Sequence, residues 1–398
     1  MQVRELLHTL FSNTLEFMHA KRAFALLDAV QGLLLGKKLS LTHLARHLTS
    51  PTKERNCIRK MDRLLGNRKL HSEIKSCYHA HCILLLGKIA NPVISIDWAA
   101  TDKRQNWHIL RATLTVDKRG YALYQEVHPR KKSNSRHVQH EFLNKLKSIL
   151  PENCKPIIIT DAGFRFPWFG KVKQIGFNFV GRVRQKTKYR TARDKKWNDN
   201  CLSLYEKATR RPAFLGKLFF TKQDHECNVV LYKKTIKGKK HINRSGNLTN
   251  NNASNRCARR ERDPWLLVTS LEITRSFNPE RIAALYALRM QIEEDFRDIK
   301  SHRYGFSLRY SLSNNIKRLE VLLLIAALAC FVCWLVSLSA KRKNLHLDYQ
   351  SNSIKHRNVL SVIYLGCQLI RRNEEFSLAE LKEAYQVIQS LALKAFLC

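Results

Sequence analysis

The chain has 398 residues, enough for two or three domains, and its 44% hydrophobic residues are typical of a globular protein. It carries 71 lysines and arginines against 32 aspartates and glutamates, a formal net charge of +39 at pH 7. Such an excess indicates a polyanionic partner, most simply nucleic acid. A surface made basic only for solubility is the alternative. A membrane-surface role would explain the charge but not the carboxylates described below.

The cysteines and the most apolar segment indicate in which cellular compartment the protein works. The 11 cysteines form no regular framework, which favours reduced thiols in a cytoplasm. A zinc site near Cys77 and Cys82 is an alternative, but the neighbouring histidines are too closely spaced for the usual ligand pairs. The 16-residue apolar run 321–336 is just short of a comfortable membrane span, and we expect a buried core helix there. The chain begins without a signal-peptide pattern.

Residues 1–88 are predicted to form a helical DNA-binding region. Apolar residues recur there at helical spacing, and the segments Ser40–Leu48 and Thr52–Leu65 suggest a helix–turn–helix with Pro51 in the turn. The second of these helices carries five cations: Lys53, Arg55, Arg59, Lys60 and Arg63. They form either a phosphate-contacting face or a solvated charged face.

Strand patterns begin after Pro92 and alternate with helices, which indicates a mixed α/β sheet. The predicted strands are Val93–Asp97, Trp107–Val116, Tyr121–Val127, Pro156–Asp161 and Phe177–Val183, with helices at Val138–Leu150 and Pro167–Ile175. Two of the strands end on a carboxylate, Asp97 and Asp161. A hairpin turn is expected at residues 117–120.

Residues 186–262 interrupt this pattern with 21 lysines and arginines and only 6 acids. Two strand-like runs, Ala213–Thr221 and Cys227–Lys233, precede an Asn/Ser/Arg-rich segment, Arg244–Arg260, which we expect to be a mobile loop. We interpret the whole as a β-rich basic insertion that lies along a nucleic-acid backbone; a solvated insertion without a role is the alternative. The strand Trp265–Leu271 then returns the chain to the core.

One predicted helix, Pro279–Ser301, arranges polar side chains in a stripe. Tyr286, Arg289, Glu293 and Lys300 stand at offsets 0, 3, 7 and 14, which lie within roughly 60° of one another on a helix. The neighbouring acids Glu294 and Asp295 point elsewhere. An acid flanked by two cations suits a metal ion beside a phosphate.

Asp97, Asp161 and Glu293 together form a candidate metal site. Oxygen-only ligands favour Mg²⁺, with Mn²⁺ as a substitute, over zinc. Two such ions about 3.5–4 Å apart would activate a water or a 3′ hydroxyl and stabilise the leaving oxygen of a phosphodiester. The alternative is that the two aspartates only cap their strands.

The motif Tyr286-x2-Arg289-x3-Glu293-x6-Lys300, preceded by both aspartates, resembles the signature of the insertion-sequence family four transposases. The resemblance covers nearly the whole length. It includes the segments Arg63–Arg68, Ile96–Trp98, Asp161–Phe164 and Gly181–Arg184.

The resemblance implies a ribonuclease-H-like core interrupted by a β-strand insertion, with the catalytic and metal-binding residues Asp97, Asp161 and Glu293. It implies DNA contacts from Tyr286, Arg289, Lys300, Trp265, Arg182 and Arg184. Trp265 stands where relatives stack a tryptophan near a flipped base; a core tryptophan is the alternative. The implied domain limits are 1–88, 89–185, 186–262, 263–312 and 313–398, the last a helical C-terminal region.

The resemblance also implies the reaction and the partners. A bacterial, nucleoid-associated enzyme would cut inverted-repeat ends of double-stranded DNA, form and reopen hairpins, and join the 3′ ends to target DNA. It would act as a homodimer with Mg²⁺ and without a membrane. Three other functions stay open: a DNA-binding protein without catalysis, a single-span membrane protein, and a metal-dependent RNA nuclease.

Overall fold

The computed structural model describes residues 3–87, 89–101, 106–116, 119–184, 187–194, 196–197, 200–221, 224–234, 263–354 and 356–397. They form two compact units, each with its own strands and helices. Unit one contains residues up to 156 and from 290 to 397, and unit two contains residues 157–289. The predicted segment Arg244–Arg260 lies outside the described residues.

The sheet of unit one is a three-stranded antiparallel meander of β1 (Val93–Ala100), β2 (Trp107–Val116) and β3 (Arg119–Pro129). All three predicted strands are confirmed. The predicted end of the first at Asp97 is wrong, because Trp98 to Ala100 continue the ladder to β2. β2 and β3 are buried along most of their length, which explains their dense apolar sequences. α6 (Arg136–Ile149) confirms the helix predicted after the hairpin.

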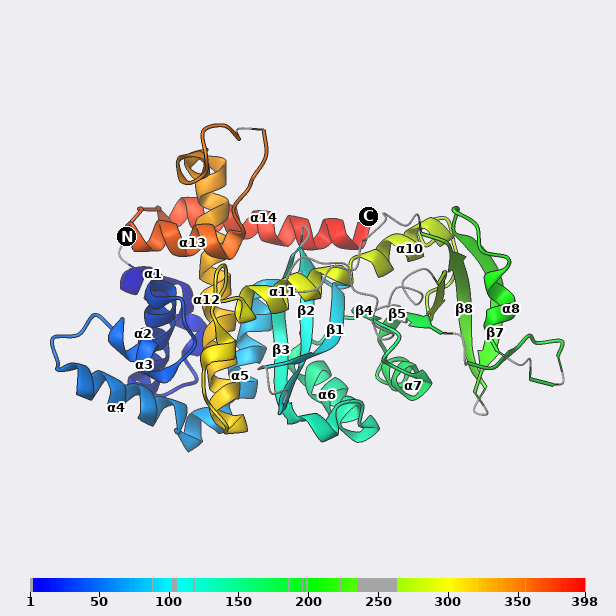
Figure 1. The fold of residues 1–398 in the computed structure, drawn as a ribbon, viewed down its shortest axis with the longest axis horizontal. Coiled ribbons are helices and arrows are strands. Elements are labelled where there is room, and N and C mark those ends of the chain that lie inside the picture. Colours follow the sequence, from blue (N-terminus) through cyan, green and yellow to red (C-terminus); the bar gives the residue numbers. More distant parts are fainter. Residues whose placement is uncertain are drawn as a thin grey trace, which may run out of the picture. The chain divides into compact units, whose positions relative to one another are not determined.

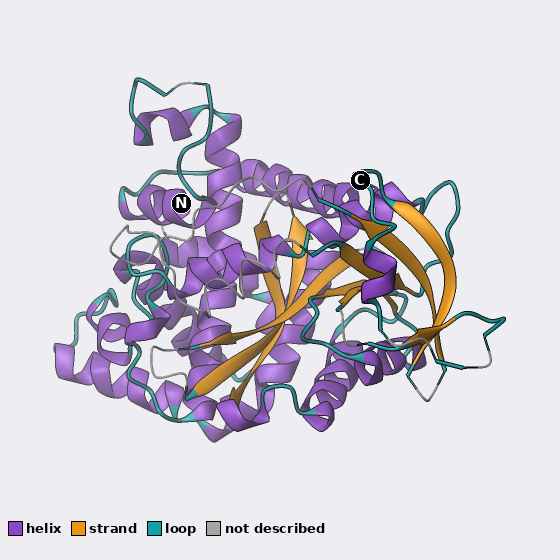
Figure 2. Ribbon diagram, turned by 45° about the vertical axis from the view of Figure 1, so that its right-hand side comes forward, coloured by secondary structure: helices purple, strands orange, loops and turns teal. Residues whose placement is uncertain are grey.

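Helices make up most of unit one (Figure 2). The N-terminal region is helical as predicted, and the expected helix–turn–helix corresponds to α3 and α4. The bounds of its helices are Val3–Phe11 (α1), Ala20–Gly36 (α2), Leu41–Arg46 (α3), Glu54–Leu65 (α4) and Arg68–Leu86 (α5). Asn67 starts α5 as an N-cap, since its side-chain oxygen accepts the Leu70 N–H at 2.9 Å.

The apolar run becomes the centre of α12 (Ile316–Arg342). This helix passes between the N-terminal helices and the sheet of unit one, and α13 (Val362–Arg371) and α14 (Leu378–Leu397) also pack on it (Figure 1). It is the one helix among the described residues that is long and apolar enough to cross a membrane, but 94% of its apolar window is buried by the chain itself. The predicted core helix is confirmed.

Unit two contains a mixed sheet in the order β4-β5-β9-β8-β7-β6. β4 and β5 are parallel and joined by α7, while the other pairs are antiparallel. The strands are β4 (Ile157–Thr160), β5 (Asn178–Val183), β6 (Tyr189–Arg190), β7 (Ala213–Phe220), β8 (His225–Tyr232) and β9 (Trp265–Thr269), with helices α7 (Phe166–Gln174), α8 (Leu202–Tyr205) and α10 (Pro279–Ala287). The predicted strands and the first helix are confirmed, and the mixed α/β class with them.

The single long helix predicted over residues 279–301 is wrong. It is two helices, α10 and α11 (Met290–Lys300), with a turn at Leu288 and Arg289 between them. Both turn residues donate their N–H to the carbonyl three residues earlier, at 3.1 Å each, which tightens the backbone and ends α10. No glycine or proline marks the break. The stripe geometry therefore holds only within each helix.

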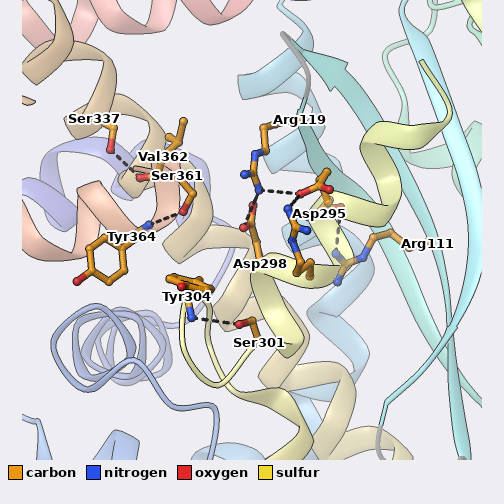
Figure 3. A network of polar contacts seen from close by, with 12 residues as sticks. Arg111, Arg119, Asp295, Asp298, Ser301, Tyr304, Ser337, Ser361, Val362 and Tyr364 are labelled. Atoms are coloured by element: carbon orange, nitrogen blue, oxygen red, sulfur yellow. Dashed lines mark hydrogen bonds and ion pairs between the residues drawn. The ribbon is translucent and has the colours of Figure 1, made fainter. Parts of the chain in front are cut away.

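Charged side chains anchor α11 to the sheet of unit one (Figure 3). Arg111 on β2, 1% exposed, forms an ion pair with Asp295 at 3.0 Å, and Thr113 donates to the same carboxylate at 2.9 Å. Arg119 on β3 binds Asp298 at 2.8 Å. Arg111 also donates to Gln125, whose amide donates in turn to the Leu323 carbonyl of α12 at 3.0 Å.

We expect Arg111→Met to lower the free energy of unfolding by about 3–5 kcal/mol, because it leaves the Asp295 carboxylate buried without its cation. The double variant Arg111→Met with Asp295→Leu removes both charges and should recover most of that loss. Urea denaturation measures both.

The matched control is Arg46→Ala, since Arg46 pairs with Glu54 in the open at 52% and 57% exposure. It should cost less than about 1 kcal/mol. An equal cost for Arg46→Ala and Arg111→Met would contradict the assignment of α11 to a buried charged anchor.

Candidate active site

Asp97 lies inside β1, opposite Arg111 of β2 in the antiparallel ladder. Its side chain is half-buried, and one carboxylate oxygen accepts the Trp98 N–H at 2.7 Å. A backbone donor of this kind stabilises the ionised carboxylate and restricts its rotation.

Glu293 and Lys300 are seven residues apart on α11 and therefore share one face of the helix. Both line a pocket of about 840 Å³ in unit one, together with Arg297. Glu293 is exposed, whereas Asp295 is buried, as the helical offsets predicted. The apolar residues Ile292, Phe296 and Ile299 of α11 are buried.

Electrostatics link Lys300 to Asp97. The pKa of Lys300 is lowered to about 8: burial lowers it most, the cations Arg111 and Arg309 also lower it, and Asp97 raises it. Its ammonium lies over the Phe296 ring, 4.7 Å from the centroid. Asp97, Glu293 and Lys300 thus belong to one region of unit one.

Asp161 follows β4 directly, as predicted, and is half-buried. Its carboxylate accepts the Gly163 N–H at 2.7 Å, which closes the turn at Ala162 and Gly163. A side chain at Gly163 would come within 2.9 Å of that carboxylate oxygen, so a larger residue there would displace the Asp161 carboxylate.

Tyr286 on α10 is the centre of the group around Asp161. Burial raises its pKa; Arg289 and Arg182 lower it, Asp161 raises it, and Arg184 lowers it. The Trp265 ring packs edge-on against Tyr286, with centroids 4.8 Å apart. The other five candidate residues of unit two therefore lie around this tyrosine.

Two details of this group differ from a simple DNA-contacting surface. Tyr286 is only 4% exposed. Arg182 is 8% exposed and donates to the carbonyls of Asp263 and Pro264 at 3.0 and 3.3 Å, so it secures the start of β9. Its assignment to DNA stays a prediction. Trp265, by contrast, is only half-buried.

The structure divides the predicted triad between the two units. Asp97 and Glu293 belong to unit one and Asp161 to unit two. Within the described stretches, no three or more histidine, cysteine, aspartate or glutamate side chains form a group that could hold a metal ion. Neither unit alone supplies all three carboxylates.

Sequence reasoning missed three residues of these groups: Arg111, Arg309 and Lys234. Arg111 stands in an apolar strand, where a lone arginine is unusual and was a usable signal. Arg309 lines the pocket, and Lys234 lies 5.2 Å from the Trp265 ring centroid. In so basic a chain, nothing in the sequence distinguishes these last two from other cations.

The comparison with protein families gives one match. The family described as the transposase DDE domain matches residues 90–330, more than half of the chain. The chain belongs to the DDE transposase family. This membership makes it a DNA-binding transposase that cuts and transfers DNA strands with divalent metal ions. A comparison with curated proteins finds no match.

The predicted metal-binding residues all carry carboxylates, the kind of donor that the divalent metal ions of this family prefer. Asp97, Asp161 and Glu293 offer oxygen donors, two of them oriented by backbone N–H groups and one on an exposed helix face. This donor set suits a hard divalent cation. When bound, the metal would activate a nucleophilic oxygen and stabilise the leaving one.

We expect the ammonium of Lys300 to titrate near pH 8, protonated below and neutral above. In Asp97→Asn its pKa should fall, because the neighbouring negative charge is lost, and in Arg309→Ala it should rise. NMR of isotopically labelled lysine side chains measures these values.

The internal control is Lys37, whose pKa is lowered by burial and which should give the same value in all three proteins. If Asp97→Asn leaves the Lys300 titration unchanged, the two side chains are not neighbours.

Proposed function

We propose that the chain is a cut-and-paste transposase of the insertion-sequence family four type, resembling the transposase of the insertion sequence that flanks a tetracycline-resistance transposon. One observation carries the proposal: Glu293 and Lys300 share a cation-lined pocket, and Lys300 senses the charge of Asp97. Acid and cation at this spacing suit a metal ion beside a scissile phosphate.

Asp97, Asp161 and Glu293 are the proposed catalytic residues and would hold Mg²⁺, with Mn²⁺ as a substitute, in a two-ion site. Each chemical step of transposition is an in-line displacement at phosphorus, so one set of carboxylates suits hydrolysis, hairpin formation, hairpin opening and strand transfer.

The remaining candidate residues would hold DNA. Lys300 would contact the phosphate next to the cut, and the negative charge of that phosphate would favour the protonated form of the lysine. Tyr286, Arg289 and Arg184 would grip the strand beside Asp161, with Arg182 supporting them from behind. Trp265, half-buried between Tyr286 and Lys234, would stack on an extruded base.

The N-terminal helices add a surface for double-stranded DNA. Arg55, Arg59 and Arg63 repeat every fourth residue along α4 and are exposed. The acids of α4 are already neutralised, Glu54 by Arg46 and Asp62 by Arg318. A groove of about 560 Å³ between α2 and α4 is lined by cations of both helices. We propose that it receives the phosphate backbone of an inverted-repeat end, in a homodimer that acts in the bacterial cytoplasm at the nucleoid.

We expect Asp97→Asn, Asp161→Asn and Glu293→Gln each to reduce nicking of end DNA about a thousandfold, equivalent to about 4 kcal/mol of barrier. Each variant should still bind the DNA, because the cations are untouched. Nicking is measured by a gel assay with Mg²⁺, with EDTA as the metal-free reaction. DNA binding is measured by fluorescence anisotropy.

Glu294→Gln is the matched control, since Glu294 is the adjacent acid on α11 and pairs with Arg297 instead of facing the pocket. It should nick normally. Near-normal nicking by any of the three test variants would remove that residue from the catalytic set, and retained binding without nicking in the wild type would favour a DNA-binding protein without catalysis.

Lys300→Ala should mainly impair the steps after the first nick, because it removes the cation that holds the cleaved end. We expect a hairpin yield at least about fivefold lower, the effect of losing one charged hydrogen bond of 1 kcal/mol or more. Lys300→Arg, which keeps the charge, should retain more of it. An unchanged hairpin yield in Lys300→Ala would end the proposed role.

A further inference from the structure

The segment between α11 and α12 forms a wall of the pocket that contains Glu293 and Lys300. Its first half is fixed to α11: the Phe306 N–H donates to the Asp298 carbonyl at 2.9 Å, and Phe306 is fully buried. A side chain at Gly305 would come within 1.8 Å of that carbonyl oxygen, so only glycine permits this approach. Asn315 then caps α12 by accepting the Arg318 N–H. The wall is held at both ends.

The middle of this wall presents large side chains to solvent. Leu312 is 92% exposed and has a φ of 54°, a left-handed conformation that costs a leucine about 1–2 kcal/mol. Tyr310 beside it is 51% exposed. Strain and apolar exposure at one residue both oppose stability, and such combinations occur where a ligand uses them.

The rest of the pocket is cationic and aromatic. Arg297, Lys300, Arg303 and Arg309 line it, against the single acid Glu293. The rings of His302 and Tyr310 lie 5.0 Å apart in the same wall. Cations beside exposed aromatic rings are the recurrent site for single-stranded nucleic acid, where phosphates follow the charges and bases stack on the rings.

The size of the pocket favours a single strand over a duplex. Its volume of about 840 Å³ falls within the range of sites that enclose small ligands, about 300–1,000 Å³. It can admit a nucleotide or two, but not a duplex, whose major groove alone is about 12 Å wide.

We propose that this pocket binds unpaired nucleotides at the DNA end, with a base on Tyr310 and His302, phosphates on Arg303 and Arg309, and Leu312 as a wedge that keeps the two strands apart. The source of the strand rests on the proposed transposase function. Trp265 is not among the residues that line this pocket.

The first test measures binding without catalysis. The probe is a single-stranded pentanucleotide containing 2-aminopurine, titrated with the full-length protein in EDTA. Stacking should quench its fluorescence, and Tyr310→Ala should weaken binding about fivefold or more, the loss of roughly 1–3 kcal/mol of base stacking.

Tyr304→Ala is the matched control for that titration. Tyr304 is 52% exposed in the same segment but does not line the pocket. It should bind the pentanucleotide like the wild type. The proposed nucleotide-binding site would be refuted if wild type and Tyr310→Ala bound the pentanucleotide with equal affinity. It would also be refuted if both tyrosine variants lost affinity equally.

The second test concerns the wedge. Leu312→Ala should nick fully paired end DNA about fivefold or more slowly than the wild type, because separating base pairs costs a few kcal/mol that the wedge no longer helps to supply. The same variant should nick an end whose terminal pairs are mismatched at the wild-type rate.

If Leu312→Ala slows nicking of the paired and the mismatched substrate equally, the proposed role of Leu312 as a wedge is refuted. A wild-type protein that binds the pentanucleotide through Tyr310 but cuts neither substrate would refute the proposed function while leaving the pocket standing.

Discussion

The buried ion pair between Arg111 and Asp295 fixes α11 on the sheet of unit one. Two charges removed from water are tolerated only in good geometry, so the pair restricts how the helix can rotate or slide on β2. Thr113 and the Arg119–Asp298 pair reinforce that restriction from the same sheet. With these acids on the inner face, the helical repeat directs Glu293 and Lys300 to the pocket. The polar face of α11 is thus a consequence of its buried one.

The same logic explains how a chain of net charge +39 keeps an ordered core. Among the described residues, several acids form ion pairs: Asp295 and Asp298 on α11, Glu126 with Lys145 and His128, and Asp62 with Arg318. Cations in excess then gather along α4 and around the pocket. Since these like charges repel one another in the free protein, binding of a polyanion neutralises them and stabilises the protein.

The residues proposed for the active site belong to two different units. In unit one, the sheet and α11 carry Asp97, Glu293 and Lys300; in unit two, β4, β5, β9 and α10 carry Asp161 and the residues around Tyr286. The chain passes from one to the other at the turn of Leu288 and Arg289. The two halves of the signature motif therefore belong to different units.

The sequence by itself determined most of the strands, the buried course of α12, and the exposure of Glu293 against the burial of Asp295. Each follows from local patterns: runs of β-branched residues, a continuous apolar stretch, and the 3.6-residue repeat. The tertiary structure alone decided where β1 ends, because pairing with β2 extends the strand through Trp98 and over two alanines that have little strand preference of their own. It alone broke the signature helix, where no residue type forbids helix, and it alone gave Arg111 its partner 184 positions further along the chain. Long-range packing outweighs weak local preference at such positions, and only the folded chain brings those partners together.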